Sequence, residues 1–250
     1  MRLLHRALTS LASCFLLAQA GAALASDIGV TPVAVHLDKA NDRATVNVNN
    51  SGTDPVIMQV EAIAWHHEGG VDEDLPTGDM VINPSVFTVQ PGKSQLVRIG
   101  LRRAAQADHE GTYRIVLREV PAAPRPGEVR ISGQVTVLMA LRVPIYVAPV
   151  NVVRNLNWQA TQAADGTVTA SLRNDGNVHV RVGKIQLKSG DNGAVQGDHP
   201  MAAVVFPGEA RSFKLSAARP DSVAAGTSVA TLEVSTDQGV QIVPVALAQR

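Results

Sequence analysis

Apolar and polar residues alternate in short segments along most of the chain. The clearest of these segments are residues 44–48, 56–60, 112–116, 167–172, 178–182 and 227–234. Gly, Asn, Asp and Pro residues separate them, and no stretch after residue 25 sustains an apolar period of 3.6 residues. A period of two is typical of half-buried β-strands, and these separating residues are typical of turns. The pattern therefore predicts an all-β protein.

One alternating run is much longer than the others. From position 129 to position 147, every odd-numbered residue is apolar except Gly133, whereas the even positions include Arg130, Gln134 and Arg142. An ordinary strand has about 5–6 residues, so this ribbon exceeds what one sandwich strand needs. A long exposed apolar face is an aggregation hazard. We therefore expect a partner protein, or a second copy of the chain, to cover it.

The two halves of the chain repeat one construction. The segment VNNSG at 48–52 is matched by LRNDG at 172–176. Pro91-Gly92 and Pro207-Gly208 each precede a basic residue, Arg98 or Lys214, at the same interval. Proline fixes φ and glycine accepts a positive φ, so the chain can reverse between strands at both places. The repeat predicts two related β-sandwiches.

The N-terminus is typical of a secretory signal peptide. Arg2 and Arg6 precede an apolar stretch that is too short to span a bilayer, and the small-residue triplet Ala23-Leu24-Ala25 follows. We expect cleavage after Ala25, so residues 1–25 are removed from the 250 and 225 remain. The single cysteine, Cys14, is lost with the signal, so burial rather than a disulfide must stabilise the mature protein.

A proline at a strand exit marks the expected domain boundary. Pro149 follows the long alternating run and stiffens the connection after it. We therefore assign residues 26–148 to an N-terminal immunoglobulin-like domain and residues 149–250 to a C-terminal one.

Charge and motifs exclude several classes of function. Without Arg2 and Arg6, 20 basic residues face 22 acidic ones, which gives a net charge of −2. The basic residues are scattered and aromatic residues are scarce, so nucleic-acid binding is not expected. The chain contains no nucleophile elbow, zinc-binding HExxH, phosphate loop or dinucleotide fingerprint. We expect neither enzymatic activity nor a cofactor.

Residues 65–74 form the best candidate for a metal site. His66 and His67 lie close to the acidic residues Glu68 and 72–74, and imidazole and carboxylate groups bind metals. Adjacent histidines on an extended chain point to opposite faces, however, and Gly69-Gly70 indicates a turn. We interpret this segment as a solvated hairpin loop and expect no metal.

Three segments together resemble the periplasmic chaperones that assemble pili in the chaperone/usher pathway. The first is PSVFTVQPGKSQLVR at 84–98, with an apolar strand, a Pro-Gly turn and a second strand ending in V-R. The second is YRIVLREVP at 113–121, and the third is the long run at 131–149. Their order along the chain is that of the family.

The resemblance implies two immunoglobulin-like sandwiches set at an angle, with pilin subunits as partners in the cleft. Such chaperones lend a strand to a pilin that lacks one, and they deliver the pilin to an outer-membrane usher. Here the lent residues would be Ile131, Val135, Val137 and Met139. The free protein would be able to cover the same strand by forming a homodimer.

The family also anchors the carboxylate of its client with basic residues in the cleft. By resemblance those places fall at Ala34 and Pro144, neither of which is basic. Arg142 and Arg114 are the nearest substitutes, because guanidinium groups bind carboxylates in a bidentate manner. The alternative for each is an ordinary outward-facing arginine on a strand.

Two other functions fit an all-β chain of this kind. A structural pilus or adhesin subunit is the main alternative, although residues from 26 onward enter an alternating segment almost directly, without an N-terminal donor extension. A carbohydrate-binding sandwich is a further alternative, but no cluster of aromatic residues offers a stacking platform.

Overall fold

A computed structural model describes residues 28–102, 108–121, 137–163, 165, 167–189, 194–200, 202–217 and 229–249. Every regular element in these ranges is a β-strand, which confirms the predicted fold class. Within the same ranges, no helix is long and apolar enough to cross a membrane.

The first body of the structure is a sandwich of two sheets around one core. Its strands are β1 (Ile28–Thr31), β2 (Val35–Leu37), β3 (Arg43–Asn50), β4 (Val56–Glu68), β5 (Val71–Pro76), β6 (Met80–Asn83), β7 (Val86–Val89), β8 (Ser94–Leu101), β9 (Gly111–Val120) and β10 (Ala140–Val147). One sheet has the order β1-β3-β8-β6, and the other has β2-β10-β9-β4-β5, with β7 also paired to β4. Alternate residues such as Val46 and Val48 are fully buried between the sheets.

The second body is built from eight further strands. They are β11 (Leu156–Gln162), β12 (Val168–Asn174), β13 (Val180–Ser189), β14 (Ala194–His199), β15 (Ala203–Val205), β16 (Ala210–Ala217), β17 (Val229–Thr236) and β18 (Gly239–Gln249). They form one hydrogen-bonded sheet that folds back on itself where β14 pairs with β13. A separate core, which includes Leu172, Ile185 and Leu232, fills its interior.

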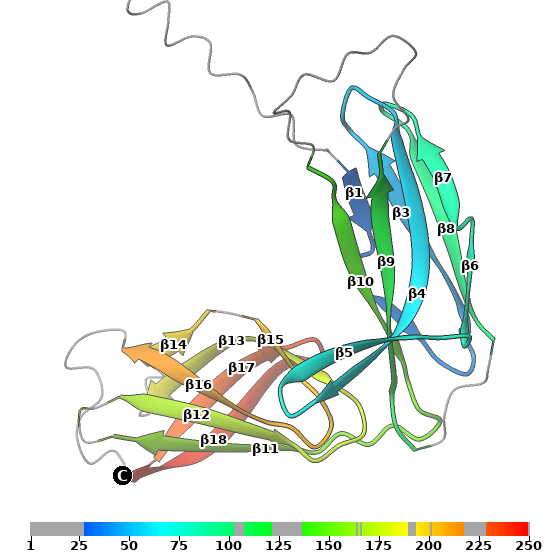
Figure 1. Ribbon diagram of the computed structural model, residues 1–250. Helices are drawn as coiled ribbons and strands as arrows, with labels where there is room; N and C mark the ends of the chain where they lie inside the picture. The colour runs from blue at the N-terminus through cyan, green and yellow to red at the C-terminus, as the bar shows by residue number, and fades with distance from the viewer. Residues whose placement is uncertain are drawn as a thin grey trace, which may run out of the picture.

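The two bodies lie at an angle, with the β4–β5 hairpin of the first reaching over the second (Figure 1). This is the predicted arrangement of two tandem β-sandwiches, each of which buries its own apolar residues. The boundary that we propose, between Ala148 and Pro149, falls in the segment that joins β10 to β11.

The repeated turn found in the sequence has the same structure in both bodies. Asn50 and Asn174 are buried, and the side-chain amide of each donates two hydrogen bonds to backbone carbonyls. The side-chain oxygen of each accepts the backbone N–H of a glycine, Gly52 or Gly176. The backbone carbonyl of each accepts the N–H of the glycine in the Pro-Gly turn, at 2.8 Å in both bodies. The two sequence repeats are therefore halves of one hydrogen-bonded motif.

The Pro-Gly turns need their glycines. Gly92 has a φ of 66° and Gly208 a φ of 78°, which is the left-handed region that residues with a side chain rarely adopt. The turns therefore hold the Asn-bearing strand end and the following strand together in each sandwich.

The long alternating run is only partly described by the structure. Ile131 and Val135 lie outside the described residues. Residues 137–139 are described but lie before the start of strand β10 at Ala140. Val137 is 83% exposed, so this apolar side chain has almost no cover within the described parts of the chain.

We predict that Asn174→Ala lowers the free energy of unfolding by about 2–3 kcal/mol. The change leaves two buried carbonyls and one N–H without their partner, and an unpaired buried group is costly. Urea unfolding followed by circular dichroism measures the loss. The matched control is Asn157→Ala, because Asn157 is exposed and, among the described residues, its side chain hydrogen-bonds only to Asp175. If both variants lose the same free energy of unfolding, the hydrogen bonds of the buried Asn174 contribute no more to stability than an exposed one, which would contradict the prediction.

Candidate functional site

A cleft of about 600 Å³ lies between the two bodies. Its first wall is the outer face of the sheet that contains β10. Val143 and Ile145 of that strand point into the core, whereas Arg142, Pro144 and Tyr146 line the cleft. This division follows from the period of a strand, which sends alternate side chains to opposite faces.

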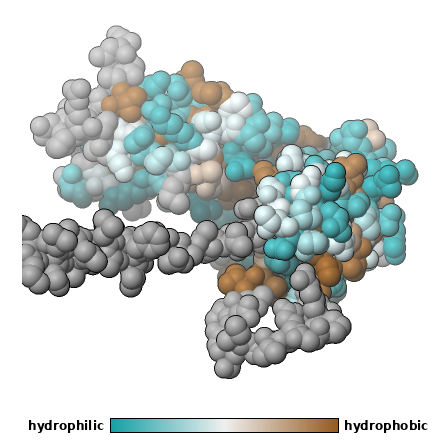
Figure 2. Space-filling model, turned by 90° about the horizontal axis from the view of Figure 1, so that it is seen from above, coloured by the Kyte–Doolittle hydropathy of each residue, from teal (hydrophilic) through white to brown (hydrophobic). Residues whose placement is uncertain are grey.

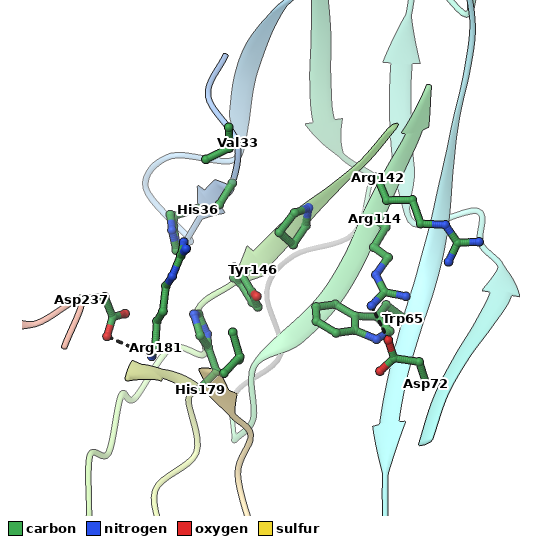
Figure 3. Close-up of a pocket in the computed structure, with 13 residues that line it drawn as sticks. Val33, His36, Trp65, Asp72, Arg114, Arg142, Tyr146, His179, Arg181 and Asp237 are labelled. Atoms are coloured by element: carbon green, nitrogen blue, oxygen red, sulfur yellow. Dashed lines mark hydrogen bonds and ion pairs between the residues drawn. The ribbon is translucent and has the colours of Figure 1, made fainter. Parts of the chain in front are cut away.

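The opposite wall comes from the second body. His179, Arg181, Val204 and Asp237 line it, and they face His36, Trp65 and Arg114 of the first body (Figure 3). The cleft therefore combines aromatic, apolar and charged groups from segments that are far apart in the sequence.

An aromatic cluster joins the two bodies at one side of the cleft. Trp65, Tyr146 and Phe206 are all buried in it, and only Phe206 belongs to the second body. The rings of Trp65 and Phe206 pack edge to face at 4.9 Å between centroids, and His67 packs on Phe206 at 4.6 Å. Aromatic pairs in this geometry are favourable beyond the area that they bury. The cluster thus fixes how the two sandwiches meet.

A buried hydrogen-bonded pair forms another contact between the bodies. The Nδ1 atom of His179 lies 2.8 Å from Oε2 of Glu110, and both side chains are less than a tenth exposed. The same carboxylate oxygen accepts the backbone N–H of His179 at 2.9 Å. The ring of His179 also stacks on Tyr146, with centroids 3.6 Å apart. Burial raises the pKa of Tyr146 to about 12, and the nearby charge of Glu110 adds to this rise.

Arg114 is held in place by three neighbours. Its Nη2 lies 2.6 Å from Asp72, its Nη1 lies 3.0 Å from Asp74, and its guanidinium lies 3.8 Å above the ring of Trp65. The side chain is only 12% exposed. Arg142 is different, because its one ion pair with a described residue is with the other oxygen of Asp74, and its side chain is 51% exposed. Asp74 therefore bridges the two arginines.

The acidic residues after the Gly-Gly turn lie in a strand, whereas the sequence predicted a solvated loop. Gly69 and Gly70 do form the turn of a hairpin, with positive φ values of 60° and 81°. Asp72 and Asp74, however, belong to strand β5 and form ion pairs with Arg114 and Arg142. The sequence could not reveal this contact, because β5 and β9 are separated by three other strands along the chain.

Asp72 is the group in this cluster whose pKa is clearly shifted. Burial by itself raises the pKa of this carboxyl group, but hydrogen bonds from Arg114 and His67 outweigh it. The pKa therefore lies well below its usual value of 3.8.

The histidines of the hairpin have partners other than a metal. The Nδ1 atom of His67 lies 2.6 Å from Asp72, and its Nε2 lies 3.6 Å from Glu209 of the second body. In the part of the chain that the structure describes, no group of three His, Cys, Asp or Glu side chains is arranged to hold a metal ion.

Four of the residues singled out in the sequence meet in the cleft. Arg142 and Arg114 line it together, and so do Ala34 and Pro144. Met139 lies just before β10 and is half-buried, and its backbone N–H donates to the side chain of Glu119. The sequence analysis did not identify Arg181. The local pattern of its strand does not indicate that this residue faces the other domain.

We predict that Asp72→Asn destabilises the protein at neutral pH by at most about 1 kcal/mol, since Asp72 is 45% exposed and solvent screens its ion pair. The pKa of Asp72 is lowered by folding, so its contribution is present above pH 3.8 and is lost as pH falls toward the folded-state pKa. Urea unfolding of both proteins across this pH range should show their difference vanish in acid. The control is Glu73→Gln, an exposed neighbour without an ion pair among the described residues. A difference that persists unchanged in acid would contradict this account.

Several solved structures of chaperones, some of them in complex with a pilus subunit, have this architecture. The CsuC–CsuE chaperone–adhesin complex of Acinetobacter baumannii matches with a TM-score of 0.57 and 14% identity over 89% of this chain and 99% of that one. The CupB2 chaperone of Pseudomonas aeruginosa gives 0.55 and 17% over 88% and 100%. The complex of the SafA pilin with the SafB chaperone of Salmonella enterica gives 0.57 and 15% over 90% and 99%. At these identities the matches establish the fold.

A search of curated proteins finds no match. The profile of the family described as "Pili and flagellar-assembly chaperone, PapD N-terminal domain" matches residues 27–153, which is about half of the chain. The match covers the first sandwich, including the strands that carry Arg114 and Arg142. The chain therefore belongs to the family of pili and flagellar-assembly chaperones, which are not enzymes.

Proposed function

We propose that this protein is a periplasmic chaperone that binds pilin subunits by donor-strand complementation and delivers them to an outer-membrane usher. The observation that carries the proposal is a strand edge that no other described strand covers before Ile145 and that leads into the interdomain cleft. One edge of β10 pairs with β9 over its whole length. On the other edge, β2 pairs only with Ile145, Tyr146 and Val147.

The backbone groups on the open edge are available to a partner strand. The carbonyl of Met139 accepts the N–H of Glu119 at 2.9 Å, which makes this a hydrogen-bonded position of the ladder. By the alternation of an antiparallel pair, Ala140, Arg142 and Pro144 direct their backbone groups away from β9. Proline is tolerated on such an edge, because its missing N–H leaves the β9 ladder intact. A client strand can thus add to β10 by backbone hydrogen bonds.

The apolar side chains that precede β10 supply the second part of the interaction. Val137 is 83% exposed and Leu138 is 43% exposed. Seen end-on, the surface of the first body carries separate hydrophobic patches among polar ones (Figure 2). We propose that Ile131, Val135, Val137 and Met139 enter the core of a pilin that lacks a strand. Each fully buried aliphatic side chain would contribute about 1.5–3 kcal/mol.

The two solved complexes support the choice of client. One complex pairs a chaperone of this fold with a tip adhesion subunit, and the other pairs one with the SafA pilin. We propose that this chain also binds pilus subunits and delivers them to an usher. We further propose that the signal peptide at residues 1–25 directs its export. Without a client, the open edge and Val137 would be covered by a second copy of the chain, as a homodimer.

Arg142 and Arg114 remain our candidates for binding the client carboxylate. Arg142 is the better placed of the two, because it is half-exposed and shares only one carboxylate. Arg114 is enclosed by Asp72, Asp74 and Trp65, so its main effect would be to hold Asp74 near Arg142.

We predict that the double change Val135→Asp and Val137→Asp lowers recovery of bound pilin at least about tenfold, because two apolar anchors are lost and two charges must be desolvated. The measurement is co-purification of a tagged chaperone with pilin subunits encoded in its own genome. The matched control, Gln134→Asp with Thr136→Asp, places the same charges on the other face of the run. Equal recovery from both double variants would refute donation by the odd-numbered face.

A further inference from the structure

The second domain has a strand edge that no described strand covers over most of its length. Strand β18 pairs with β17 from Gly239 to Ala246 on one side. On the other side, β11 pairs with β18 only from Leu247 onward, and no other described strand pairs with residues 239–246 there. An unpaired edge can pair with another chain, and proteins usually protect such edges with charged residues, proline or a bulge.

This edge has little of the usual protection. The segment GVQIVPVA at 239–246 contains no charged residue, and Pro244 is its only proline. Val240 is 64% exposed and Ile242 is 70% exposed. Strand β5, at the edge of a sheet in the first domain, is different, because it carries acidic residues at 72–74. The β18 edge is therefore an uncharged, apolar edge that is open to a partner strand.

Pro244 shows which backbone groups of β18 face the open edge. Proline has no N–H group, and Pro244 pairs with Thr231 in an unbroken register, so its backbone groups point away from β17. In an antiparallel pair, alternate residues direct their backbone groups to the same side. Val240 and Ile242 therefore present both an N–H donor and a carbonyl acceptor to the open edge.

The inner side of the same strand borders a small cavity with polar walls. The cavity has a volume of about 250 Å³, and its lining includes Gln238 and Gln241 beside the start of β18 and Arg154 and Leu156 beside the start of β11. Gln241 is half-buried. Side chains on the inner face of a strand added to β18 would lie over this cavity, next to the Gln241 amide.

A second copy of β18 complements this edge on both faces. If two copies pair antiparallel about a two-fold axis at Gln241, Val240 of one copy lies opposite Ile242 of the other, and the two residues exchange backbone hydrogen bonds. Their exposed side chains then form two apolar cross-strand pairs on the outer face. On the inner face the two Gln241 amides meet, and each can both donate and accept a hydrogen bond. No charge in residues 239–246 opposes the pairing.

We propose that two chains associate through their β18 edges, so that one β-sheet continues from the second domain of one chain into that of the other. The contact is isologous, because the same surface serves both chains. This dimer differs from the one proposed above, which covers the open edge of β10 in the first domain. Ile242 does not line the cleft, so the inference does not depend on how a pilin binds.

The first test is sedimentation equilibrium of the mature chain carrying Val135→Asp and Val137→Asp, which disable the association proposed for the first domain. We expect this protein to remain in a monomer–dimer equilibrium. Adding Ile242→Lys should raise the dissociation constant of the dimer at least about tenfold, because two like charges then lie close together across the axis. The matched control is Val195→Lys. Val195 is also an exposed aliphatic residue of the second domain, but it lies on β14, which has a paired strand on each side.

A cysteine at the axis tests the register of the pairing. Cys14 is the only cysteine of the chain and is lost with the signal, so Gln241→Cys gives a mature protein with one thiol. Across the axis the two thiols would occupy a non-hydrogen-bonded pair with about 4.5 Å between Cα atoms, which a disulfide can span. Mild oxidation should therefore link two chains. The control Ser235→Cys, at an exposed position of β17, should not link them, because β17 is paired on both edges.

The outcomes separate this dimer from the chaperone function. A monomer at every concentration, or a dissociation constant that Ile242→Lys does not change, overturns the β18 dimer. Equal disulfide formation in Gln241→Cys and Ser235→Cys overturns the register. Ile242→Lys alone should leave recovery of bound pilin unchanged. If it lowers that recovery while the protein is monomeric, the edge serves the client, and association through a second copy is refuted.

Discussion

The contact between the two sandwiches determines what the rest of the structure can do. Phe206 of the second domain packs against Trp65 and Tyr146 of the first, and His179 forms a buried pair with Glu110 beside them. Trp65 and Tyr146 lie on the outer face of a sheet of the first domain, and without the second domain that face would be open to solvent. Because these contacts fix the second domain over one end of that face, the remaining part becomes a cleft with charged side chains from both domains. Leaving Glu110 or His179 without its partner would be costly at such a buried position, so the pair also restricts the angle between the domains.

Strand β10 links this cleft to the surface where a client would bind. Its odd-numbered side chains belong to the core of the first domain, and its even-numbered ones line the cleft. Its free edge runs from the exposed residues before Ala140 to Pro144. One element therefore holds the domain together, presents hydrogen-bonding groups and leads an added strand to the arginines. Asp72 and Asp74 hold Arg114 and Arg142 in position, so most of the positive charge in the cleft is already balanced.

Local patterns revealed much of the fold and only part of the site. The period of two predicted the strands, and the paired turns at Asn50 and Asn174 predicted two related sandwiches, because these signals lie within a few residues of one another. Arg142 and Arg114 were chosen through a resemblance, as the nearest substitutes for the basic residues that the family keeps in the cleft. The ion pairs with Asp72 and Asp74 and the position of Arg181 were not found. They depend on how a hairpin and a second domain dock across long sequence separations, which no local pattern records.

The central claim is that a pilin adds its strand to the free edge of β10. Amide hydrogen exchange of the full chain, measured with and without a pilin from its own genome, tests it most directly. The account predicts that a bound pilin slows exchange at Ala140 and Arg142, whose N–H groups lie on the free edge, while the amides that face β9 change little. Unchanged exchange at Ala140 and Arg142 in a complex that holds the pilin would contradict the account.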